Sequence, residues 1–116
     1  MADSPKETRL LMANEPYAYR EVIAGAVRVI RSDIEVMVVE PLKLDGAVGD
    51  FKPDIVICSA ATKTVKSEVR VWVELYPKLG AQSTVSIGGE CSEIAGIQLS
   101  DLLSIVDSAT QRIPNN

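Results

Sequence analysis

Histidine is missing from this chain of 116 residues, and cysteine occurs only twice, at Cys58 and Cys91. Without histidine, neither a Ser-His-Asp nor a Cys-His catalytic arrangement can form, and the commonest metal ligand is lost. Two cysteines are too few for a zinc cluster. A disulfide is possible by count, but Cys58 lies in an apolar run, where cysteine behaves as a small hydrophobic residue. We therefore predict no enzyme activity, no metal and no cofactor.

Dense basic blocks and long apolar stretches are also lacking. The formal net charge of −4, without a cluster of Lys and Arg, argues against binding to nucleic-acid phosphates. No stretch approaches the roughly 20 apolar residues of a membrane span, and residues 1–8 lack the apolar core of a signal peptide. We expect a cytoplasmic protein with neither nucleic-acid nor membrane partners.

The composition is that of a globular protein, with 47% hydrophobic and 24% charged residues. A chain of this length can build one hydrophobic core but not two. We therefore predict a single domain over residues 1–116, with residues 1–8 and 113–116 as loose tails.

The run from Ile55 to Ser59 follows Pro53-Asp54 and is apolar without alternation until its last residue. Such a run is typical of a strand buried on both faces, at the centre of a parallel sheet. Further strands are predicted over residues 9–13 and 34–40, a helix from Pro16 and a short helix over residues 45–51. The β-α-β-α-β order predicts helices on both faces of the sheet.

The helix after Pro16 carries an apolar stripe, which we predict to face the core. Its members are Tyr19, Val22, Ile23, Ala26, Val27 and Ile30. The opposite, solvated side is assigned to Arg20, Glu21, Arg28 and Arg31.

Beyond Ser59 the pattern changes to a period of two, which predicts a half-buried strand from Val69 and a β-hairpin over residues 69–87. Residues 60–68 are polar and receive no assignment. Residues 91–99 are predicted to be irregular, with a short edge strand near Ile97, and a final helix begins near Ser100. The pair Gly88-Gly89 either makes a turn or, with Lys63 and Lys66, cradles an anion.

The outward side of this hairpin carries a possible partner surface. It consists of Arg70, Trp72, Glu74 and Tyr76. Either the aromatic residues pack as ordinary core, or they form a protein-binding patch, for which a homodimer is the favoured arrangement.

Three segments of the first half resemble the receiver domains of two-component response regulators, in the type usually followed by a LuxR-type DNA-binding unit. The segments are Asn14-Glu15-Pro16-Tyr17-Ala18-Tyr19-Arg20-Glu21, Ser32-Asp33-Ile34-Glu35-Val36 and Lys52-Pro53-Asp54-Ile55-Val56-Ile57-Cys58-Ser59. The resemblance covers residues 9–60. It implies a flavodoxin/CheY-like three-layer α-β-α fold, modified in the second half by the hairpin in place of a helix.

The same resemblance places Asn14 and Glu15 at the acidic pair of the family, and Ser59 at its phospho-accepting aspartate. The family uses these carboxylates to hold Mg²⁺ and to attack phosphorus. Asn14 and Ser59 therefore imply that phosphotransfer is lost. In a purely structural alternative, Asn14, Glu15 and Ser59 only cap the ends of strands and helices by hydrogen bonds. We expect a non-catalytic receiver-like signalling module that binds a protein partner or itself. The alternative is a sensor of a small ligand, nucleotide or anion at the strand edge near Ser59 and Gly88.

Overall fold

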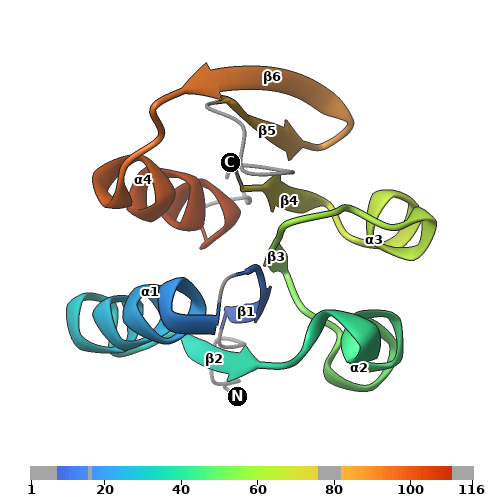
Figure 1. Cartoon of the computed structure of the whole chain (residues 1–116), viewed down its shortest axis with the longest axis horizontal. Helices are drawn as coiled ribbons and strands as arrows, with labels where there is room; N and C mark the ends of the chain where they lie inside the picture. The colour runs from blue at the N-terminus through green and yellow to red at the C-terminus, as the bar shows by residue number, and fades with distance from the viewer. Residues whose placement is uncertain (1–7, 16, 76–81, 111–116) are drawn as a thin grey trace, which may run out of the picture.

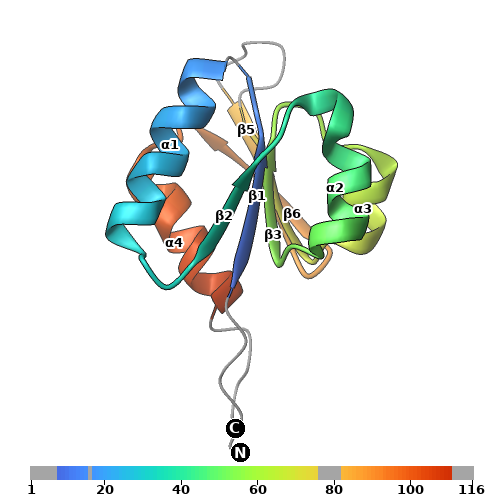
Figure 2. The same ribbon diagram turned by 90° about the horizontal axis from the view of Figure 1, so that it is seen from below.

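The computed structural model describes residues 8–15, 17–75 and 82–110. They form a six-stranded sheet between two pairs of helices (Figures 1 and 2). In chain order the elements are β1 (Arg9–Ala13), α1 (Tyr17–Ile30), β2 (Glu35–Val38), the 3-10 helix η1 (Pro41–Lys43), α2 (Leu44–Phe51), β3 (Ile55–Cys58), α3 (Lys63–Glu68), β4 (Val71–Glu74), β5 (Gln82–Ile87), β6 (Glu90–Ala95) and α4 (Leu99–Thr110).

The sheet is mixed, with the strand order β2-β1-β3-β4-β5-β6. The first four strands of this order are parallel to one another, whereas β5 runs antiparallel to both β4 and β6. The expectation of a parallel sheet therefore holds for β1 to β4 only. The connection from β4 to β5 spans residues 75–81, which is too short for the helical crossover that a parallel strand would need.

Both faces of the parallel part are covered, by α1 and α4 on one side and by α2 and α3 on the other (Figure 2). Successive side chains of a strand point to opposite faces, so β1 divides its residues between two hydrophobic clusters. Leu10 and Met12 belong to the cluster under α1 and α4, and Leu11 and Ala13 to the cluster under α2 and α3. All four residues of β3 are buried, as predicted for the central strand.

The hairpin predicted over residues 69–87 is confirmed by the pairing of β4 with β5, in which Val71 faces Ile87 and Glu74 faces Thr84. The prediction for residues 91–99 is wrong, because β6 extends the hairpin into a third strand. Gly88 and Gly89 connect β5 to β6 with φ angles of +60° and +92°. Two residues of positive φ match the twist of a tight hairpin, so this pair makes a turn.

A helix is retained between β3 and β4, so the hairpin does not take the place of a helix there, contrary to our expectation. This helix, α3, falls within the segment that received no assignment. Thr62 starts it, because its side-chain oxygen accepts a hydrogen bond from the Val65 N–H at 3.1 Å. The departure from alternating strands and helices lies after β4. There β5 and β6 follow as antiparallel strands, joined to each other only by Gly88-Gly89.

The face of α1 that contacts the sheet agrees with the predicted stripe only at Val27, which is buried, and at Ile23, which packs against the core. Arg20, Ala24 and Val27 are its buried residues, whereas Val22 is 70% exposed. Arg20 reaches the carbonyl of Val39 with Nη1 at 2.9 Å, and its guanidinium lies 4.9 Å from the centre of the Tyr17 ring. A long side chain can be buried in this way when its polar end finds an acceptor. Apolar residues surround most of α1, so their spacing alone does not fix the inward side.

Candidate functional site

Asn14, Glu15 and Ser59 meet at the carboxyl edge of the sheet, because β1 and β3 are neighbours with Ala13 opposite Cys58. The N–H of Glu15 donates to Ser59 Oγ at 2.7 Å, and the Ser59 hydroxyl donates to the Glu15 carbonyl at 3.4 Å. The side chain of Ser59 thus ties together the ends of two strands. This is the capping role that serine hydroxyls commonly take.

The Asn14 side chain is fully buried at this edge. Leu10 and Met12 contact the α1/α4 cluster, so the alternation of the strand directs Asn14 toward the same layer. Within the described residues, neither its Nδ2 nor its Oδ1 has a hydrogen-bond partner, and the same is true of Arg20 Nε. Buried polar atoms without partners cost about 1–3 kcal/mol each. Asn14 and Arg20 therefore both bury polar atoms that lack hydrogen-bond partners among the described residues.

Sequence reasoning missed Arg20, which it placed on the solvated side of its helix. The signal that could have found it is the phase of α1, because Arg20, Ala24 and Val27 follow one another at intervals of four and three. The small Ala24 leaves room on this side for a long neighbour.

The chemistry available at the carboxyl edge is limited. Glu15 is exposed, and within the described residues the Ser59 hydroxyl bonds the backbone of Glu15 and no basic side chain. The Glu74 carboxylate, at the end of β4, accepts the N–H of Ala61 at 2.8 Å and so holds the loop before α3. In the described ranges, no three His, Cys, Asp or Glu side chains come together in a way that could hold a metal ion.

The thiol of Cys58 is buried in β3 and faces the α2/α3 layer. Burial raises the pKa of Cys58 to about 12, and the nearby Glu74 carboxylate adds to the rise. A cysteine with such a pKa stays protonated at neutral pH and is a poor nucleophile. Cys91, in contrast, is exposed on β6.

The partner surface expected on the hairpin does not form as one patch. Trp72 is only 6% exposed and belongs to the cluster under α2 and α3, so for this residue the core alternative is confirmed and the exposed patch is wrong. The physical reason is α3, which covers the face of β4 that the sequence left open. Arg70 is exposed and Glu74 half-buried, and Tyr76 lies outside the described residues.

Ser59 and Gly88 lie at opposite ends of the sheet, so a single ligand site near both is excluded. Cys58 pairs with Glu74 at the end of β4, whereas Ile87 pairs with Val71 at its start. The antiparallel direction of β5 is the cause, because it returns the chain to the amino edge before Gly88.

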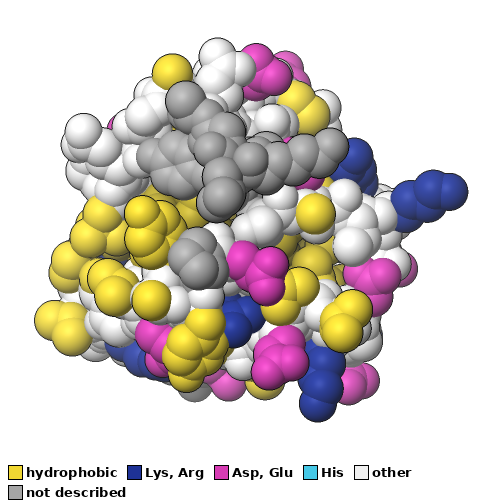
Figure 3. All heavy atoms as spheres, in the orientation of Figure 1, with side chains coloured by type: hydrophobic (Ala, Val, Ile, Leu, Met, Phe, Trp, Pro, Cys, Tyr) yellow, Lys and Arg dark blue, Asp and Glu magenta, His cyan; other side chains and the backbone are white. Residues whose placement is uncertain are grey.

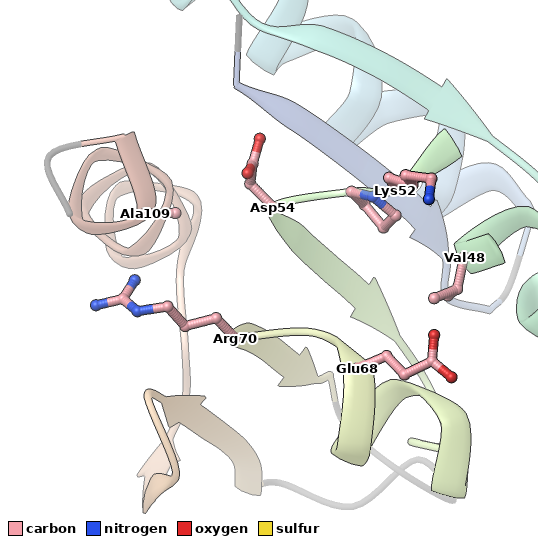
Figure 4. A pocket seen from close by; sticks show the side chains of 7 residues that line it. Val48, Lys52, Asp54, Glu68, Arg70 and Ala109 are labelled. Carbon is pink, nitrogen blue, oxygen red and sulfur yellow. The ribbon is translucent and has the colours of Figure 1, made fainter. Parts of the chain in front are cut away.

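A cleft of about 400 Å³ occupies that amino edge, between the ends of α2 and α4 (Figure 4). Its lining includes two cations and two anions, namely Lys52, Arg70, Asp54 and Glu68. Figure 4 shows the side chains of Arg70 and Glu68 pointing away from each other. Because these charged groups differ in sign and point in different directions, they do not form a binding site for one ligand group.

Exposed apolar side chains concentrate on α1 instead. Five of its large residues are at least 48% exposed, namely Tyr17, Tyr19, Val22, Val29 and Ile30. Between α1 and the start of α4 lies a groove of about 350 Å³, lined by Tyr19, Val22, Ile23, Leu75, Ile97, Gln98, Leu99 and Leu102. Figure 3 shows hydrophobic side chains gathered over the side of the molecule where α1 lies. Concentrated apolar surface of this kind marks a contact site.

Comparisons of the chain with protein-family models, with curated proteins and with solved structures find no match. Within the described residues, no helix combines the length and apolar character needed to cross a membrane.

Proposed function

We propose that this protein is a non-catalytic, receiver-like module that acts through protein–protein contact in the cytoplasm. The strand order β2-β1-β3-β4, with helices on both faces, supports a CheY-like origin for the first part of the fold. The three positions that resemble the phosphotransfer pocket of receivers are neighbours at the carboxyl edge, which also supports it. The antiparallel β5 and β6 are a departure from that plan.

The hydrogen bonds of the Ser59 hydroxyl are the main support for the proposal that the module is non-catalytic. A phospho-acceptor must present a nucleophilic oxygen beside a metal ion held by carboxylates. Here the hydroxyl is engaged with the backbone of Glu15, and the neighbouring Asn14 supplies a buried neutral amide. Glu15 alone contributes a negative charge at these three positions, which is too little to hold Mg²⁺ firmly.

The exposed apolar side of α1 supports the protein-binding part of the proposal. Val22 and Val29 are 70% and 81% exposed, although each could be polar without any loss to the core. Apolar side chains in such positions gain stability only when another surface covers them.

Phosphoryl labelling tests this function. Wild type incubated with acetyl phosphate and Mg²⁺ should take up no label, and Ser59→Ala should behave identically. Stoichiometric label in wild type that is lost in Ser59→Ala would contradict the proposal. So would a millimolar or tighter Mg²⁺ site, measured by titration calorimetry, that disappears in Glu15→Ala.

A further inference from the structure

We propose that the surface that covers α1 is α1 of a second copy, packed antiparallel to it in a two-fold dimer. This inference rests on the proposed protein-binding function and names its partner. Three features of α1 carry it: an outermost apolar stripe, two flanks of opposite character, and a small residue at the middle.

The outermost stripe follows from the buried side of the helix. Arg20, Ala24 and Val27 contact the rest of the protein, and at 3.6 residues per turn the opposite side is centred on Val22 and Val29. These two valines are separated by seven residues, which is two turns, so they stand in line along the helix. Both are mostly exposed, at 70% and 81%.

The two flanks of this stripe differ. Glu21 and Arg28, also seven residues apart, lie on the flank toward β2, where Arg28 donates a hydrogen bond to the Val36 carbonyl at 3.3 Å. Tyr19 and Ile30 lie on the flank toward α4, and Tyr19 lines the groove there. One flank is therefore charged with both signs, and the other is apolar.

An antiparallel copy matches both flanks at once. A two-fold axis perpendicular to the two helices reverses the direction of α1 but keeps each flank beside its own equivalent. When the axis passes between Ala24 and Gly25, Glu21 lies opposite Arg28 of the copy, and Arg28 opposite its Glu21. On the other flank, Tyr19 lies opposite Ile30 of the copy. A parallel two-fold pair would instead set the charged flank against the apolar one.

Gly25 occupies the middle of this arrangement. A Cβ atom placed on it would meet no described atom within 4 Å outside the neighbouring backbone, so packing among the described residues does not require glycine there. Glycine within a helix lowers helix stability, and its lack of a side chain lets a second helix approach closely. The contact is limited to a helix of roughly 21 Å, so we expect a weak dimer with a dissociation constant on the order of 10 µM.

Sedimentation over a concentration series from about 1 to 500 µM measures this association. Wild type should move from the monomer mass of 12.5 kDa toward twice that mass. Val29→Glu should weaken the dimer about tenfold or more, because it buries a charge in the stripe. Leu42→Glu is the matched control, since Leu42 is 98% exposed but lies outside α1 in η1, and it should leave the dimer unchanged.

A charge exchange tests the antiparallel geometry itself. Glu21→Arg and Arg28→Glu should each weaken self-association, because each sets like charges opposite each other twice. Mixed in equal amounts, the two variants should associate more strongly than either alone, because both contacts become attractive. Circular dichroism confirms that each variant remains folded.

Three results would overturn the dimer: wild type that stays monomeric at 500 µM, a wild-type dimer that Val29→Glu does not weaken, or a mixture no stronger than its components. None of these bears on phosphoryl labelling, which tests the lack of catalysis separately. A failure of the dimer is therefore distinguishable from a failure of the receiver-like function.

Discussion

The two helical layers of this protein differ in how completely their apolar side chains are buried. On one face, α2 and α3 have only eight and six residues, yet Leu44, Val48, Phe51 and Val65 are buried over the sheet. Their polar ends are tied together, because the Thr62 hydroxyl donates to Asp45 Oδ1 at 2.6 Å. On the other face, α1 has 14 residues but carries Val22 and Val29 on its outward side.

The difference shows that helix length does not decide how well a face is closed. The short layer directs its few apolar residues inward, and Trp72 of β4 fills the space beneath it. The long layer has more apolar residues than its contact with the sheet can bury. We interpret this surplus as a surface for a partner. The large apolar side chains of α2 and α3, in contrast, are already buried against the sheet.

Removal of Trp72 should break the closed layer and have the largest effect. Trp72→Ala leaves a cavity under α2 and α3, so we expect a loss of about 3–5 kcal/mol in the free energy of unfolding, measured by urea denaturation. Leu42→Ala, at an exposed site, should change it by less than about 0.5 kcal/mol. A Trp72→Ala protein that keeps full stability but no longer dimerises would show that the dimer interface lies on the hairpin and not on α1.

A smaller effect is expected from Arg20, which joins α1 to Val39, the residue after β2, in the other layer. Arg20→Met removes the hydrogen bond to the Val39 carbonyl, at a cost of about 1–2 kcal/mol. Removal of a buried charge offsets part of that cost, so the net loss should be about 1 kcal/mol. Arg28→Met is the control on the same helix, because the exposed Arg28 also bonds a backbone carbonyl, that of Val36 in β2. Equal losses in the two variants would show that the burial of Arg20 has no special role.

The smallest effect concerns the ion pair that joins the end of α1 to α4. Arg31 donates two hydrogen bonds to Asp107 at 2.8 Å, and this contact lowers the pKa of the Asp107 carboxyl group. A lowered folded-state pKa stabilises the protein above the ordinary aspartate value, and the gain is lost as the pH falls below about 4. The melting temperature of wild type should therefore exceed that of Asp107→Asn at pH 7, and the gap should shrink below pH 4. A gap that widens in acid would contradict the assigned contact.

The centre of the parallel part could be predicted because β1 and β3 are buried on both faces. Such strands are uninterrupted apolar runs, as at Ile55 to Cys58, and they need no knowledge of their neighbours. The position of Ser59 at the carboxyl edge followed from the same logic, whereas its grouping with Asn14 and Glu15 came from the resemblance to receiver domains.

Other features depend on contacts between distant segments and were missed. The strand β6 is mostly exposed, so it shows no buried face in its sequence. Trp72 was placed outward because α3, with Val65 as its one buried residue, gives a weak helical signal. Burial of Arg20 required knowledge of the Val39 carbonyl, which only the folded chain brings near.

Amide hydrogen exchange at two protein concentrations tests the central claim most directly, because it compares the two layers in one experiment. If α1 is covered by a second copy, its amides should exchange more slowly at about 300 µM than at about 3 µM, a range that spans the expected dissociation constant. The amides of α2 and α3 should exchange at the same rate at both concentrations. Exchange in α1 that does not change with concentration would contradict the account.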